Sequence, residues 1–160
     1  MKVPAEQRNR KPLQAVLLLA SFFLLACDSG PGPAARKQPG PDLAYLADVA
    51  KLRQMDRDAE KLFAQGKGDD AATLIQAGEP VAAKVLAVPH PTLEATEAAA
   101  DLDELYGKML FSNKRYGWAR LQFQKNVVRW KYWKPQTPET ARRLQAALAQ
   151  IADCDRRIVQ

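Results

Sequence analysis

A run of basic and aromatic residues is the first feature of this sequence that could do chemistry. Residues 114–133, KRYGWARLQFQKNVVRWKYW, contain all three tryptophans of the chain and six lysines or arginines, and no acidic residue. Cationic side chains bind phosphate and aromatic rings stack on bases, so this composition is what a nucleic-acid surface requires. Nucleic-acid binding is therefore a first hypothesis for this stretch. The N-terminal residues test it, because they indicate where in the cell the protein is located.

Cys27 is the second feature, because it follows a segment typical of exported proteins. The first eleven residues contain four cations, and Leu13 to Ala26 form an apolar run that only Gln14 and Ser21 interrupt. This run is shorter than the roughly 20 apolar residues that a membrane-spanning helix needs. A charged segment followed by a short apolar run and a small residue indicates an export signal. We therefore predict that residues 1–26 are a signal peptide.

The end of this run, Leu24-Leu25-Ala26-Cys27, resembles the lipobox of bacterial lipoproteins. The resemblance implies cleavage before Cys27, which then carries fatty acyl chains such as palmitate on its sulfur and on its new amino group. The thiolate is the nucleophile that takes the lipid, and several acyl chains anchor a protein stably to a membrane. The alternatives are a plain secretory peptide and a transmembrane anchor, each with an incidental cysteine. Asp28 resembles an enterobacterial signal for the inner membrane, and the choice of membrane stays open.

A lipid anchor facing the periplasm changes the interpretation of the basic stretch. A protein in that position rarely meets nucleic acid, so we predict no nucleic-acid partner. The charge is also segregated, because residues 27–103 carry a net charge of −5 and residues 104–135 carry +7. Such segregation bears on association and not on fold. It is consistent with contact between copies, with an acidic partner or with anionic material of the envelope.

The remaining reactive side chains do not predict catalysis or metal binding. His90 is the only histidine, and its position between two prolines predicts a surface turn. Asp101, Asp103 and Glu104 do not share one helix face, so we expect them to form a solvated side of a helix. There is no glycine-rich phosphate loop and no Ser-His-Asp set. We predict a non-enzymatic protein without cofactor or metal.

Cys154 is the one cysteine left once Cys27 is lipidated. Leu144, Leu148, Ile151 and Cys154 follow one another by three or four residues, the spacing of one face of a helix. We therefore expect Cys154 to continue a buried apolar stripe. Pairing with a cysteine of another chain is the alternative in an oxidising compartment.

The elements that must position these residues are helices. Residues 27–41 are rich in glycine and proline and predict a flexible tether, and residues 42–160 predict one all-helical domain. Apolar spacing and cap residues predict helices over about 42–65, 69–77, 92–111, 115–130 and from 137 onward. Asp69 or Asp70 is the expected cap of the second. Gly78-Glu79-Pro80 predicts a kink or break, with a short further helix over 81–88.

Residues 105–131 resemble one tetratricopeptide repeat. Its usual positions are matched by Tyr106, Gly107, Leu110, Tyr116, Ala119 and Phe123. Asn126 departs from the pattern, because a second alanine is usual there. A weaker unit surrounds Ala71, which lies 48 residues before Ala119. That spacing exceeds the family period of about 34 residues, so we expect an insertion over 80–91. The resemblance implies helical hairpins, and an ordinary five-helix bundle is the alternative.

The helix over 115–130 carries two apolar stripes. One consists of Tyr116, Ala119, Phe123, Val127 and Trp130, and the second of Trp118, Leu121, Val128 and Tyr132. We expect neighbouring helices to bury both stripes, because repeat hairpins sandwich such helices. If the second stripe is exposed, it forms a candidate binding face together with Arg120, Lys125 and Arg129.

These features together predict a lipid-anchored envelope protein that acts as an interaction or scaffold module, with a protein partner and the membrane as its contacts. The alternative is direct binding of anionic envelope material, such as phospholipid headgroups or wall glycan, through residues 114–134.

Overall fold

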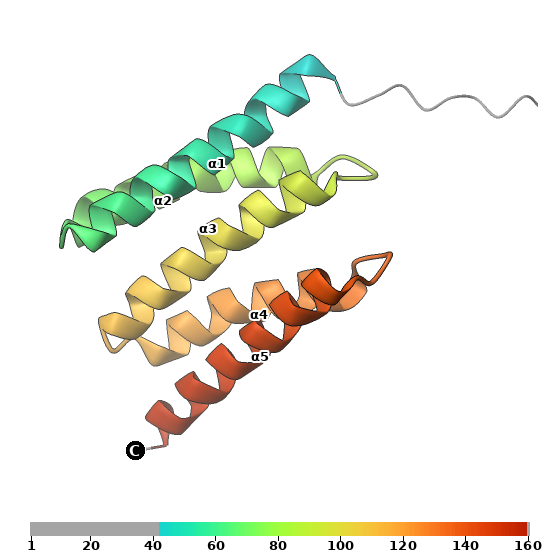
Figure 1. Ribbon diagram of the computed structural model, residues 1–160. Coiled ribbons are helices and arrows are strands. Elements are labelled where there is room, and N and C mark those ends of the chain that lie inside the picture. The colour runs from blue at the N-terminus through green and yellow to red at the C-terminus, as the bar shows by residue number, and fades with distance from the viewer. Residues whose placement is uncertain (1–41, 160) are drawn as a thin grey trace, which may run out of the picture. The chain divides into compact units, whose positions relative to one another are not determined.

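The computed structural model describes residues 42–159, which form five α-helices and, within that range, no strand (Figure 1). The helices are α1 (Leu43–Ala64), α2 (Gly68–Leu86), α3 (Leu93–Ser112), α4 (Tyr116–Tyr132) and α5 (Pro138–Ile158). The prediction of an all-α fold with about five helices is confirmed. The predicted signal peptide and tether, with Cys27 and Asp28, lie outside the described residues.

Three of the helices begin after a residue whose side chain caps them, and for α3 and α5 the sequence predicts that residue. The side chain of Asp42 accepts a hydrogen bond from the backbone of α1, and that of Thr92 accepts one from the backbone of α3. Thr137 caps α5 through a reciprocal arrangement with Thr140, and Pro138 occupies the first helical position. Each cap satisfies backbone N–H groups that have no partner inside the helix. Local sequence therefore determines these boundaries.

The predicted cap of α2 is wrong, and so is the predicted break into two helices. The N-cap residue is Lys67, and not Asp69 or Asp70. Both aspartates lie in the first turn of the helix, where the helix dipole favours a negative charge. Pro80 does not break the helix, because α2 continues to Leu86. Pro80 lies on the exposed side, as does Gln76 one turn earlier. The Gln76 carbonyl, which loses its helical donor at Pro80, can therefore bond to water.

The helices form two layers. In Figure 1, α1, α3 and α5 lie side by side, and α2 and α4 lie behind them.

The turns that join α1 to α2 and α3 to α4 are built alike. The Lys67 N–H donates to the Leu62 carbonyl at 2.9 Å, and the Arg115 N–H donates to the Leu110 carbonyl at 2.8 Å. A residue with positive φ precedes each of these donors, Gly66 at 77° and Lys114 at 57°.

All these equivalent turn residues are 48 apart in the sequence. Residues 68–86 of α2 likewise correspond to residues 116–134, which contain α4. The segment 80–91, which we expected to be an insertion, is the end of α2 and the loop to α3. The spacing of 48 arises because the helices contain 17 to 22 residues each.

Small residues permit the close approach of the two helices in each hairpin. Ala59 and Ala71 are fully buried between α1 and α2, and Gly107 and Ala119 are buried at the equivalent positions of α3 and α4. A Cβ atom on Gly107 would lie under 3.0 Å from carbons of the Phe123 ring. The ring therefore occupies the space that a side chain at position 107 would need.

The C-terminal helix packs on α4 and buries Cys154 completely. The expectation that Cys154 lies in a buried stripe is confirmed, and burial raises the pKa of its thiol. The stripe itself differs from the predicted one, because Leu148 is 42% exposed while Ala147 is buried. The helix presents Thr140, Ala147 and Cys154 to its neighbours, and their spacing of seven residues is two helical turns.

Candidate functional site: the outer face of α4

The second apolar stripe of α4 is exposed, so the expectation of burial on both sides is wrong. We call its four large hydrophobic residues the α4 row. Their exposed fractions are 63% for Trp118, 48% for Leu121, 53% for Val128 and 69% for Tyr132. Both α3 and α5 pack on the opposite side of α4, where Phe123 and Trp130 are buried. Within the described residues no further element covers the row.

The cations that we expected to surround this face are engaged in ion pairs. Arg120 contacts Asp155 of α5 at 2.7 Å, and Lys125 and Arg129 contact Asp103 of α3 at 3.1 and 2.9 Å. Asp103 is therefore not part of a solvated helix side, as we expected, but joins α3 to α4. Arg129 is largely buried. Structural pairing of this kind reduces the charge that these three cations offer to a ligand.

Asn126 strengthens the same connection between α3 and α4. Its side-chain amide is buried and donates a hydrogen bond of 2.8 Å to the backbone carbonyl of Ala100 in α3. Its oxygen accepts a bond from Arg129. Buried polar groups require such partners. The departure from a small residue at position 126 is thereby explained, because the asparagine side chain connects the two helices directly.

Four other cations remain free near the ends of the row. Lys114 and Arg115 precede α4, Lys131 lies in its last turn, and Lys134 follows it; all four are exposed. None of them has a carboxylate within ion-pair distance among residues 42–159. The Lys131 ammonium lies 5.5 Å from the centre of the Tyr132 ring. Positive charge is therefore available at both ends of the row.

An open groove of about 690 Å³ runs beside the row, between α4 and the α2–α3 junction. Its apolar lining comes mainly from Leu86, Pro91, Leu121, Val128 and Trp133. Two residues of the α4 row thus form one wall of the groove. The lining also includes Thr96, Gln124, Lys125 and Arg129. We call the row and the groove together the outer surface.

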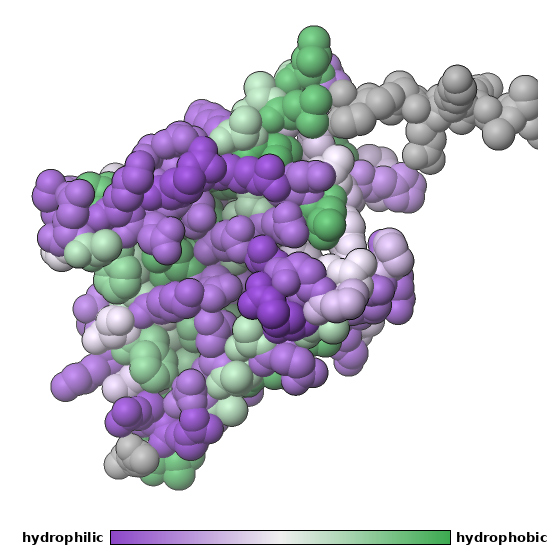
Figure 2. All heavy atoms as spheres, in the orientation of Figure 1, coloured by the Kyte–Doolittle hydropathy of each residue, from purple (hydrophilic) through white to green (hydrophobic). Residues whose placement is uncertain are grey.

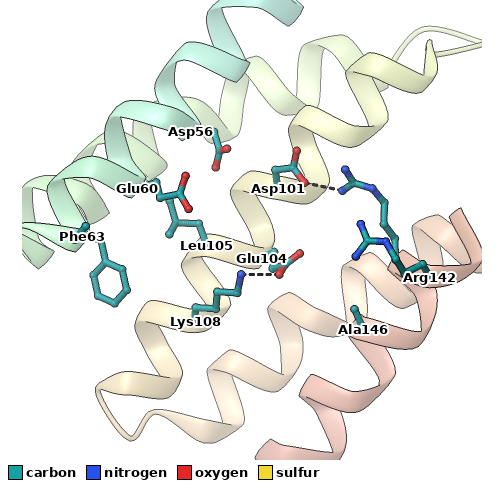
Figure 3. A pocket seen from close by; sticks show the side chains of 11 residues that line it. Asp56, Glu60, Phe63, Asp101, Glu104, Leu105, Lys108, Arg142 and Ala146 are labelled. Atoms are coloured by element: carbon teal, nitrogen blue, oxygen red, sulfur yellow. Dashed lines mark hydrogen bonds and ion pairs between the residues drawn. The ribbon is translucent and has the colours of Figure 1, made fainter. Parts of the chain in front are cut away.

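A second cavity, the inner cleft, lies between α1, α3 and α5 and has a volume of about 660 Å³ (Figure 3). The layer that contains it presents a largely hydrophilic face (Figure 2). Two of the expected solvated carboxylates lie here. Asp101 pairs with Arg143 of α5 at 2.7 Å, and Glu104 pairs with Lys108 at 2.7 Å. Both carboxylates are therefore only partly solvated, because both are half-buried and ion-paired.

Asp56 of α1 points into this cleft, with Glu60 one turn further along the helix (Figure 3). Burial, followed by the charges of Asp101 and Glu60, raises the pKa of Asp56 to about 6. Neither Asp56 nor Glu60 has a cationic partner within 4.0 Å among the described residues. Sequence patterns do not predict the cleft, because its walls come from three helices that are far apart in the chain. A repeat of 48 residues is a signal in the sequence, since it makes Asp56 of α1 and Glu104 of α3 equivalent positions, and both residues line the cleft.

The described residues hold neither a metal-binding group nor a membrane-spanning segment. No three His, Cys, Asp or Glu side chains of residues 42–159 are placed to bind a metal ion. His90 lies exposed in the α2–α3 loop, where the sequence predicts a turn. No helix in this part of the chain is long and apolar enough to cross a membrane.

Comparison of the chain with protein-family models, with curated proteins and with solved structures finds no match.

Proposed function

We propose that this chain is a lipid-anchored protein of the bacterial cell envelope whose helical domain is a non-enzymatic module for binding another protein. The resemblance of residues 24–27 to a lipobox supports the anchor on Cys27, with the domain facing the periplasm. Asp28 favours the inner membrane, and the outer membrane is the alternative. The two equivalent hairpins support tetratricopeptide-like architecture, with a spacing of 48 residues in place of the family period of about 34.

The observation that carries the proposal is the exposure of the α4 row. Four large hydrophobic side chains on one helix are between 48% and 69% exposed, and the apolar groove extends the surface they form. Contiguous exposed apolar surface of this kind marks interaction sites in soluble domains. Tryptophan and tyrosine are among the residues that contribute most to binding energy at interfaces. Trp118 and Tyr132 are therefore the expected anchors.

The test is recovery of the partner after crosslinking in cells, with Trp118→Ala compared with the unchanged chain. Loss of a tryptophan anchor typically costs at least about 2 kcal/mol of binding free energy, so partner recovery should fall by a factor of roughly 30. Because Trp118 is mainly exposed, the melting temperature of the variant should stay nearly unchanged.

Leu148→Ala is the matched control, since Leu148 is also an exposed large hydrophobic residue but lies on α5. It should leave both the melting temperature and the recovery of the partner unchanged. Equal recovery with Trp118→Ala and with the unchanged chain would exclude the α4 row as the binding surface.

A second candidate function is direct binding of anionic envelope material through residues 114–134. The observation that favours it is the group of four exposed cations that flank the row, Lys114, Arg115, Lys131 and Lys134. Sedimentation with vesicles of anionic phospholipid, or with purified wall glycan, separates the two functions. Binding that depends on these cations and disappears at high salt would support this second function.

A further inference from the structure

The residues of the outer surface have the spacing of a helix–helix seam. Trp118, Leu121, Lys125, Val128 and Tyr132 follow one another by three, four, three and four residues. This alternation has a mean period of 3.5 residues, which is the period at which one helix contacts another along its length. The exposed face of α4 is therefore patterned as the contact face of a second helix.

Lys125 occupies the centre of this spacing and does not interrupt it. Its ammonium group contacts the Asp103 carboxylate at 3.1 Å, so its charge is compensated within the domain. The methylene groups of a lysine held in this way can cover apolar surface. A polar residue at one central seam position is also a known means of fixing the register of paired helices.

The shape of the outer surface favours a convex ligand, such as a helix, over a flat one. The groove beside the row is concave and holds about 690 Å³. A flat bilayer surface would cover the four exposed side chains but leave this groove unfilled. An α-helix, with a diameter of about 10 Å including side chains, presents apolar side chains that can enter such a groove.

The charges at the ends of the row define the chemistry of that helix. Lys114 and Arg115 stand at one end and Lys131 and Lys134 at the other, all exposed and without carboxylate partners among residues 42–159. Acidic side chains outside the apolar seam of the partner would complement both groups. The row extends from residue 118 to residue 132, a length of roughly 21 Å at about 1.5 Å per residue.

We infer that the outer surface binds one amphipathic α-helix of a partner protein, about 15 residues long, with an apolar seam and acidic residues flanking it. This inference rests on the proposed function and specifies its partner. A bilayer surface and a second copy of this chain are the competing occupants.

The test is photocrosslinking of the full chain in the cells that produce it. A photoreactive amino acid replaces Trp118, Leu121, Val128 or Tyr132, one at a time, and mass spectrometry locates each adduct. We expect the four positions to crosslink to one segment of one other protein. The attachment sites should advance along that segment in steps of three and four residues, and acidic residues should flank them. A photoreactive residue at position 148 of α5 should not crosslink to this segment.

A charge-reversal variant tests the end contacts separately. Lys131→Glu combined with Lys134→Glu should lower the yield of the crosslinks at least about fivefold, because the acidic flank of the partner helix is then repelled. Lys51→Glu combined with Lys67→Glu is the control, since both lysines are exposed and lie away from α4. It should leave the yield unchanged.

The other outcomes distinguish the inference from the function on which it rests. Adducts with a protein whose attachment sites lack helical spacing would overturn the helix and leave the protein-binding function standing. Adducts with lipid, or with this chain itself, would overturn the inference in favour of the bilayer or of a second copy. Absence of any adduct at all four positions would overturn both the inference and the proposed protein-binding surface.

Discussion

Replacement of Asp56 by asparagine should stabilise the folded domain at neutral pH. Asp56 lies in the inner cleft without a cationic partner within 4.0 Å among the described residues. Burial and the neighbouring carboxylates of Asp101 and Glu60 raise its pKa from 3.8 to about 6. The ionised carboxylate is therefore less favourable in the folded domain than in the unfolded chain. Asparagine has nearly the same shape and carries no charge.

The magnitude follows from the difference between the two pKa values. One unit of pKa corresponds to about 1.4 kcal/mol, so the change from 3.8 to about 6 sets an upper limit of roughly 3 kcal/mol. The cleft is open to water, which screens the repulsion between the carboxylates. We therefore expect Asp56→Asn to raise the free energy of unfolding by about 1–2 kcal/mol at pH 7.5.

The pH dependence identifies the cause. Because the pKa of Asp56 is higher in the folded than in the unfolded chain, the folded chain retains a proton that the unfolded chain releases between about pH 4 and pH 6. The contribution of Asp56 to stability consequently falls as the pH rises through this interval and is constant above it. The advantage of Asp56→Asn should be absent below pH 4, grow up to about pH 6 and then stay level.

Urea denaturation of both proteins at a series of pH values between 3.5 and 8 measures this difference directly. Some other groups make stability rise with pH. Contact with Arg142, for example, lowers the pKa of Glu139 to about 2. These contributions are the same in both proteins and cancel in the comparison. Glu79→Gln is the control, because it removes one negative charge from an exposed position of α2. It should change the free energy of unfolding by less than about 0.5 kcal/mol at every pH. A difference between Asp56→Asn and the unchanged chain that does not vary with pH would refute the reasoning.

Two further predictions concern the packing of the second hairpin and the membrane anchor. Gly107→Ala should lower the free energy of unfolding by about 1–3 kcal/mol through overpacking against Phe123. Gly117→Ala is the control, because a Cβ atom there lies in open space. It should leave the free energy of unfolding unchanged or raise it by up to about 1 kcal/mol. Equal urea midpoints for the two variants would show that α3 and α4 do not approach closely at Gly107. Cys27→Ala should yield an uncleaved precursor that incorporates no labelled fatty acid, because no other thiolate stands at that position; normal lipid labelling would contradict the assignment of Cys27.

Local features of the sequence were sufficient to predict four of the five described helices and most of their ends. Thr92 and Thr137 mark the starts of α3 and α5 because a cap depends on a side chain and the backbone two or three residues away. The small residues Gly107 and Ala119 likewise indicate a close helix pair, and both are buried in the second hairpin. The exposed residues of the candidate face were also identifiable as a stripe, because they follow the helical period.

The tertiary structure decided which of these local signals prevail. Pro80 indicates a break, yet α2 continues through it, and the Gln76 carbonyl that loses its donor lies on the exposed side, where it can bond to water. The two apolar stripes of α4 look equivalent in the sequence, and only the position of α3 and α5 leaves the row from Trp118 to Tyr132 uncovered. Asp103 and Asp101 become ion-pair partners because residues 22 to 42 positions away approach them in space. Periodicity reports which residues share a helix face, whereas burial and pairing depend on what other helices place against that face.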